Sequence, residues 1–74
     1  METYANLGGD SNVKGFEIGV DFIRVQFKDS SIYKYTNQSA GEIHVNEMKR
    51  LAKAGQGLNS YIMLNCKKGY ESKE

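Results

Sequence analysis

The two residue types best suited to nucleophilic catalysis each occur once in this chain, as His44 and Cys66. A histidine next to a cysteine can act as a base and activate the thiolate as a nucleophile. However, His44 falls on the apolar side of an expected helix, where we expect it to lie at the edge of the core, bonded to a backbone group or a tyrosine. We expect Cys66, on a second and shorter helix, to be a small buried apolar residue. The sequence therefore predicts a protein that is not an enzyme.

Metal and cofactor chemistry also lacks its usual residues. A closed tetrahedral zinc site draws most of its ligands from cysteine and histidine, and one of each is too few. The chain has no GxGxxG, GxxxxGK[ST] or HExxH motif, and Gly8-Gly9-Asp10 lacks the flanking strand and helix of a phosphate-binding loop. We therefore expect no metal site and no cofactor, and we interpret these glycines as part of a flexible segment.

Basic and aromatic residues suggest a different chemistry, the binding of nucleic acid. The chain has ten basic and nine acidic residues, but residues 1–23 carry four acidic and one basic residue, and residues 24–74 carry five acidic and nine basic residues. A pair of lysines next to Tyr70 follows the second expected helix, and a basic and polar stripe follows two expected strands. The candidate nucleic-acid-binding residues are Arg24, Gln26, Lys28, Lys34, Lys67 and Lys68. The alternative interpretation is that these side chains form an ordinary solvated surface.

Hydrophobic periodicity predicts the elements that must position these residues. Apolar and polar residues alternate over residues 16–20 and 23–27, and residues 32–36 are rich in β-branched and aromatic side chains, which is typical of strands. A helix is expected from Ser39, through a capping box with Glu42, to about residue 54, where Gly55 provides a left-handed stop. Asn59 or Ser60 is expected to cap a second helix that reaches Cys66. The predicted fold is α+β: a three-stranded antiparallel meander followed by two helices packed on one face, in the order β-β-β-α-α.

The domain organisation follows from the same periodicity. We expect a single domain over residues 13–70, preceded by a flexible N-terminal segment (1–12) and followed by a polar tail (71–74). No stretch reaches the roughly 20 apolar residues that span a bilayer, and the N-terminus lacks the basic and apolar regions of a signal peptide. With one cysteine, no intramolecular disulfide can form. We therefore expect a cytoplasmic protein without a membrane partner.

An ordered set of short motifs resembles the KTSC domain, a bacterial module named for its occurrence at the C-terminus of some lysyl-tRNA synthetases. The motifs are Ile18-Gly19-Val20-Asp21, Val25-Gln26-Phe27, Tyr33-Lys34-Tyr35 and Gly55-Gln56-Gly57-Leu58-Asn59. The resemblance spans residues 13–70, marks Tyr33, Tyr35 and Asn59 as motif residues, and implies RNA binding through the synthetase attachment. If both tyrosines face the helices, we expect the motif to be structural, with the backbone or Asn59 as the partner of the phenol hydroxyls. The chain departs from the family pattern because it has no proline before its helix, and because Val20 and Leu58 stand where aromatic residues are usual.

The direction of the two motif tyrosines depends on the register of the strands that carry them. A three-residue loop of Asp29, Ser30 and Ser31 pairs Phe27 with Tyr33, pairs Val25 with Tyr35 and turns both tyrosines toward the helices. A two-residue loop, Asp29-Ser30, pairs Phe27 with Ile32 and leaves the tyrosines outside as stacking rings. The inward register is favoured because the outward register buries the charge of Lys34, and because Asp29-Ser30 lacks the glycine of a tight hairpin.

Taken together, the residues predict a small non-catalytic binding module. Its expected partner is RNA or DNA, contacted through a basic face of the sheet. The alternative is a protein–protein or homodimerisation module that uses the uncovered sheet face or a strand edge.

Overall fold

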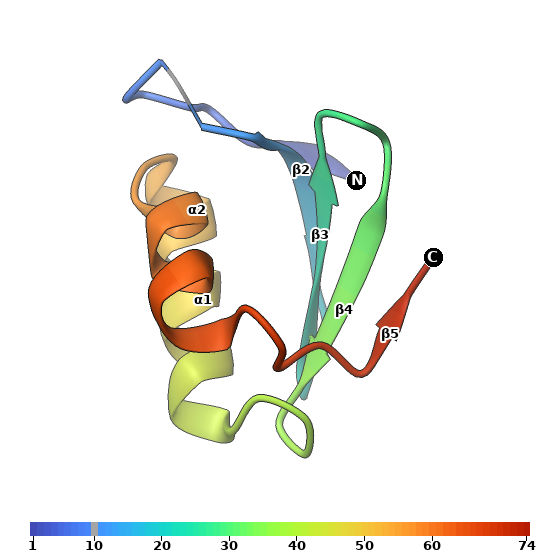
Figure 1. The fold of residues 1–74 in the computed structure, drawn as a ribbon. Helices are drawn as coiled ribbons and strands as arrows, with labels where there is room; N and C mark the ends of the chain where they lie inside the picture. The colour runs from blue at the N-terminus through green and yellow to red at the C-terminus, as the bar shows by residue number, and fades with distance from the viewer. Residues whose placement is uncertain (10) are drawn as a thin grey trace.

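The computed structural model describes residues 1–9 and 11–74; Asp10, which belongs to the predicted Gly8-Gly9-Asp10 segment, lies outside the described residues. Within the described residues, the chain forms a five-stranded antiparallel sheet in the order β1-β2-β3-β4-β5, with helices on one face (Figure 1). The strands are β1 (Glu2–Thr3), β2 (Val13–Ile18), β3 (Phe22–Phe27), β4 (Ile32–Thr36) and β5 (Ser72–Lys73). The helices are α1 (Glu42–Ala54), α2 (Leu58–Tyr61) and the π-helical η1 (Ile62–Cys66). The fold is therefore a small α+β domain.

The two outer strands extend the predicted three-stranded meander on both sides. Glu2 of β1 pairs with Phe16 of β2, and Lys73 of β5 pairs with Tyr33 of β4. Both strands lie in segments that we expected to be a flexible N-terminal segment and a polar tail. Tyr4, just after β1, is buried, and its hydroxyl accepts a hydrogen bond from the N–H of Leu58 at 3.2 Å. A two-residue strand is too short for an alternating pattern, so its order comes from backbone pairing with the neighbouring strand.

The core lies between the sheet and the helices. The apolar side of α1 packs Val45, Met48 and Ala52 toward the sheet, in agreement with the predicted amphipathic helix. The strands β2, β3 and β4 contribute Val13, Phe16, Ile23, Val25 and Tyr35 to the core. Helices α2 and η1 contribute Leu58, Ile62 and Cys66, and Tyr4 completes it from the segment after β1. Each fully buried aliphatic or aromatic side chain contributes roughly 1.5–3 kcal/mol, so these contacts hold the helices on the sheet.

Helix α1 ends as predicted but begins differently. Gly55 adopts the left-handed conformation at φ 77° and donates its N–H to the carbonyl of Leu51 at 2.9 Å. The predicted capping box is wrong, because no side chain caps the start of α1 at Glu42. Ser39 instead exchanges two hydrogen bonds of 3.0 Å with Thr36, each hydroxyl accepting the backbone N–H of the other residue. Ser39 therefore closes the turn after β4.

Helix α2 begins earlier than predicted. Its first residue is Leu58, and Gly57 precedes it in the left-handed conformation at φ 83°. Asn59 and Ser60 are consequently inside the helix, and neither caps it; the N–H of Leu58 at its start donates to the Tyr4 hydroxyl instead. The glycine turn between α1 and α2 reverses the chain, so that η1 returns beside α1 (Figure 1).

The register between β3 and β4 turns the motif tyrosines toward the helices. Tyr33 lies opposite Val25, Tyr35 lies opposite Ile23, and Tyr35 is only 1% exposed. Both predicted pairings were wrong, since Val25 was expected opposite Tyr35 or opposite Lys34. The inward orientation is nevertheless confirmed, because a shift of two residues from the favoured register leaves every side chain on the same face.

The hairpin loop explains this shift. The N–H of Phe27 donates to the carbonyl of Ser31 at 2.9 Å, so the loop is Lys28-Asp29-Ser30. Ser30, the last residue of this loop, takes the left-handed conformation, at φ 71°. The carboxylate of Asp29 accepts the N–H of Ser31 at 3.0 Å and its hydroxyl at 2.6 Å, and these bonds support a left-handed residue that is not glycine.

Candidate functional site

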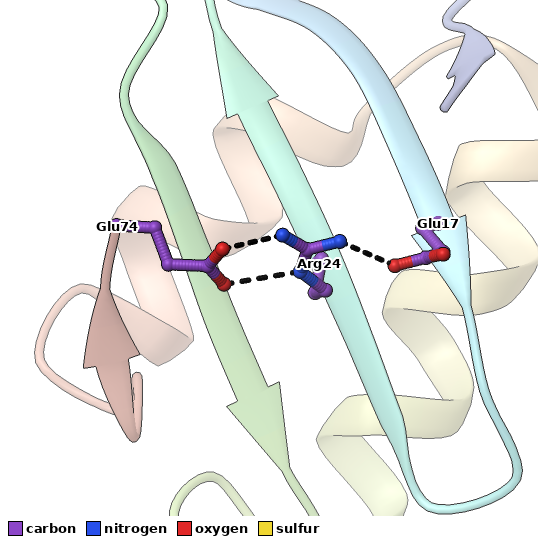
Figure 2. A network of polar contacts seen from close by, with 3 residues as sticks. All are labelled: Glu17, Arg24 and Glu74. Carbon is purple, nitrogen blue, oxygen red and sulfur yellow. Dashed lines mark hydrogen bonds and ion pairs between the residues drawn. The ribbon is translucent and has the colours of Figure 1, made fainter.

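The outer face of the sheet, which the helices leave uncovered, holds Arg24 between two carboxylates (Figure 2). The guanidinium of Arg24 on β3 donates from Nη1 to Glu17 on β2 at 2.6 Å. Its Nε donates to Glu74, just after β5, at 3.0 Å, and its Nη2 donates to the other oxygen of the same carboxylate. These bonds raise the pKa of Arg24, with Glu74 as the larger cause, and Arg24 lowers the pKa of Glu74. The charge of Arg24 is therefore balanced by carboxylates of the sheet itself.

The other candidate residues of this face also have their neighbours within the sheet. Lys34 lies opposite Arg24 on β4, with its Nζ 4.9 Å from the centroid of the Phe22 ring, a cation–π contact. Gln26 lies opposite Ile32. Lys28 does not belong to this face, because it lies in the hairpin loop. The predicted stripe of four residues is therefore divided, and the part that remains contains Glu17 and Glu74 as well as Arg24 and Lys34.

A groove of about 650 Å³ opens on the opposite face, between the β3–β4 hairpin and the C-terminal part of the chain. Ligand-binding clefts in proteins typically measure about 300–1,000 Å³, so this groove has the size of a small-molecule or nucleotide site. The sheet, α2 with η1, and the segment after η1 each contribute to its lining. The residues that the argument uses are Phe27, Tyr33 and Tyr35, then Asn59, and then Lys67, Lys68 and Tyr70.

Aromatic rings form one side of the groove. The ring centroid of Tyr33 lies 5.3 Å from that of Phe27 and 4.8 Å from that of Tyr70, and both pairs are edge to face. Tyr35 contacts Tyr70 at a centroid distance of 6.5 Å, also edge to face. Burial raises the pKa of the Tyr35 phenol, which therefore remains neutral. Tyr70 is 39% exposed, so its ring is available to a ligand.

Polar and charged residues form the remaining rim. Lys28, Lys67 and Lys68 are all exposed and line the groove together with Asp29. The ion pairs among the described residues join Arg24 to Glu17 and Glu74, and Arg50 to Glu47, and none of them includes a groove lysine. The Ser31 hydroxyl and N–H lower the pKa of Asp29, which keeps that carboxylate ionised. Among the described residues, the rim therefore has three cations against one anion, and Asn12 and Asn59 also line the groove.

The His44 and Cys66 side chains do not form a dyad. His44 Nδ1 is hydrogen-bonded to the Tyr61 hydroxyl at 2.6 Å, which links α1 to α2. Cys66 is 2% exposed, and burial raises the pKa of its thiol, the opposite of an activated thiolate. The predictions of a histidine bonded to a tyrosine and of a buried apolar cysteine are confirmed.

Two further searches concern metals and membranes. In residues 1–9 and 11–74, no group of three or more His, Cys, Asp or Glu side chains is arranged to hold a metal ion. No helix in the described part of the chain combines the length and apolar character needed to cross a membrane.

The structure brings together only part of the predicted site. Lys28, Lys67 and Lys68 line the groove with the motif residues Tyr33, Tyr35 and Asn59, whereas Arg24, Gln26 and Lys34 lie on the other face of the sheet. Sequence reasoning missed Asn12, Phe27 and Asp29 as groove residues, because only the fold brings them beside η1. Tyr70 had a local signal, since it closely follows Lys67-Lys68.

Comparison with family models, curated proteins and solved structures finds no match to this chain. The resemblance to the KTSC domain therefore stays a prediction, and the functional argument depends on the geometry of the groove.

Proposed function

We propose that this protein is a non-catalytic binding module that holds single-stranded RNA in the groove. The observation that carries the proposal is the exposed Tyr70 ring, packed on Tyr33 and flanked by Lys67 and Lys68. A base can stack on the exposed ring, while the lysine ammonium groups contact the phosphates on either side of it. The function proposed here thus uses the groove, whereas the sequence pattern suggested the outer sheet face.

Two features favour a single strand and RNA. In a duplex the faces of the bases are stacked on one another, so an aromatic ring in a groove can only reach bases of an unpaired strand. Asn12 and Asn59 are among the residues that line the groove, and an asparagine amide can both donate to and accept from a ribose 2′-hydroxyl. Asp29, an acceptor at the rim, suits the amino groups of bases or the same hydroxyl.

The proposal is tested by fluorescence anisotropy with a labelled single-stranded RNA of about ten nucleotides, a length within the usual site size of such modules. The double variant Lys67→Glu with Lys68→Glu is expected to weaken binding by more than about tenfold, because two attractive contacts become repulsive. The matched control is Lys14→Glu with Lys53→Glu, which changes the net charge equally at exposed positions outside the groove.

Equal losses in the two double variants would show that only the overall charge matters, and would contradict a site in the groove. Absence of binding by the wild-type protein at low salt would remove the proposal altogether. The predicted alternative is a protein-binding or homodimeric module, and its homodimeric form would then be tested by light scattering, where it requires a particle larger than a single chain.

A further inference from the structure

The ion pair between Arg24 and Glu74 lies on one face of the sheet but belongs to the same chain segment as a groove residue on the other face. Arg24 binds Glu74 through two hydrogen bonds from one guanidinium to one carboxylate (Figure 2). This bidentate geometry fixes the orientation of the two side chains as well as their distance, whereas a single hydrogen bond fixes only the distance. Glu74 follows directly after β5, so the ion pair holds the end of that strand to β3 across β4.

Strand β5 in turn determines where Tyr70 lies. The segment 70–74 runs along β4: the N–H of Glu71 donates to the carbonyl of Lys34 at 2.6 Å, and the N–H of Glu74 donates to the carbonyl of Ile32 at 2.6 Å. On the groove side, the Nζ of Lys73 lies 5.4 Å from the centroid of the Tyr33 ring. Tyr70, at the start of this segment, packs its ring edge to face with Tyr33. A displacement of β5 would therefore displace the exposed aromatic side of the groove.

The ion pair has a large effect on the local opening of β5 because this strand is short. A strand of two residues at the edge of a sheet has few backbone hydrogen bonds, so it opens at a small cost in free energy. An exposed ion pair contributes little to the free energy of global unfolding. Here it adds to the much smaller free energy needed to open β5 alone. A small stabilisation then changes the population of the closed segment measurably.

We propose that Arg24 is a positioning residue for the groove: through Glu74 it holds β5 against β4 and so keeps the Tyr70 ring on Tyr33. The effect on RNA rests on the proposed function, whereas the effect on β5 and Tyr70 does not. Because only the fraction of molecules with a closed segment is competent, a lower fraction reduces the apparent affinity in proportion.

The chain offers a matched pair of variants for the test. Glu74→Gln and Glu17→Gln each remove one carboxylate from Arg24 and change the net charge equally, but only Glu74 belongs to the C-terminal segment. Hydrogen exchange at the Ile32 amide, which donates to the carbonyl of Glu74, reports the opening of β5. We expect exchange about two- to fivefold faster in Glu74→Gln than in Glu17→Gln, the range that an exposed ion pair typically produces.

Proton–proton contacts between the Tyr33 and Tyr70 rings provide the second readout. They are expected to weaken in Glu74→Gln and to persist in Glu17→Gln. Equal exchange rates and unchanged ring contacts in both variants would overturn the positioning role, whether or not RNA binds.

RNA affinity separates the two proposals. If β5 opens in Glu74→Gln but the wild-type protein binds no RNA, the proposed function fails and the link between Arg24 and Tyr70 stands. If the wild type binds RNA, Glu74→Gln is expected to bind more weakly than Glu17→Gln, by no more than the change in exchange rate. Equal affinity of the two variants, with β5 open in one of them, would show that Tyr70 position does not matter for binding.

Discussion

On the outer face of the sheet, Arg24 lies between Glu17 and Glu74, whereas in the groove on the other face Lys67 and Lys68 lie beside exposed aromatic surface. Both regions are basic in sequence, and they differ in whether the protein supplies the counter-charge. A cation that already has carboxylate partners stabilises the fold, and its charge and hydrogen-bond donors are no longer available to a ligand. Cations that have no such partner among the described residues, and that lie next to rings, can bind an anion that also carries a flat face.

The largest expected effect tests which face of β4 is the inner one. Tyr35→Ala is expected to reduce the free energy of unfolding by about 3–5 kcal/mol, as for other large aromatic residues in cores. That loss equals the roughly 3–5 kcal/mol that a core of this size supplies, so the variant should be largely unfolded in a urea titration followed by circular dichroism.

The neighbouring residue provides the contrast. Lys34→Ala on the outer face is expected to change the free energy of unfolding by less than about 0.5 kcal/mol, as is usual for surface substitutions. Tyr35→Phe keeps the buried ring and is expected to fold. A stable Tyr35→Ala protein, combined with a strongly destabilised Lys34→Ala protein, would reverse the assignment of the two faces.

The next effect concerns the aromatic side of the groove. Tyr70→Ala is expected to weaken RNA binding by about 1–3 kcal/mol, the typical contribution of one stacked base. Tyr70→Phe, which preserves the ring, should bind like the wild type in the same anisotropy assay. Similar binding by the alanine and wild-type proteins would mean that no base stacks on this ring.

Salt dependence sharpens the comparison of the two sets of cations. With three lysines contacting phosphates, the logarithm of the RNA binding constant should fall against the logarithm of salt concentration with a slope of about −2. Lys28→Ala is expected to reduce the magnitude of this slope by about 0.7, since one phosphate contact is lost. Lys14→Ala, at an exposed position outside the groove, should leave the slope unchanged. The proposal is contradicted if both variants alter the slope equally.

The smallest expected effect is the pH dependence of the outer-face ion pair. Arg24 lowers the pKa of Glu74 below the ordinary value of 4.5. A carboxylate with a lowered folded-state pKa contributes stability that is complete above the ordinary value and is lost as the pH falls through the folded-state value. Exchange at the Ile32 amide, corrected for its intrinsic pH dependence, should therefore become faster below pH 4.5. In Arg24→Ala, the NMR titration midpoint of the Glu74 carboxyl should move up toward the ordinary value; an unchanged midpoint would contradict the pairing.

The elements that sequence reasoning predicted are those whose signal is local. The apolar side of α1 repeats along thirteen residues and ends at a glycine that can adopt a positive φ, so periodicity and one residue type were sufficient. The alternation in β3 likewise predicted its inner and outer faces. His44 was expected to bond a backbone group or a tyrosine, because a polar ring at the edge of an apolar face needs a nearby partner, and the structure shows the tyrosine.

The elements that sequence reasoning missed depend on partners distant in the sequence or on small differences in local energy. Strands β1 and β5 are too short to have a pattern, and they exist because β2 and β4 offer unpaired backbone groups. The hairpin register was missed because the loop lies one residue earlier than expected, with Ser30 in the left-handed conformation and Asp29 bonded to Ser31. A loop that moves by one residue changes every cross-strand pair.

The sequence alone determined that the chain forms an α+β domain, that Tyr33 and Tyr35 share one face of their strand, and that basic residues concentrate after residue 23; the structure then placed that face inside. Only the tertiary structure decided which of those basic residues have a counter-ion. Arg24 meets a carboxylate 50 residues away, while Lys28 and Lys67 converge on one groove from a hairpin loop and a helix end. Charge is a property of each residue, but its compensation depends on distances that exist only after the chain has folded.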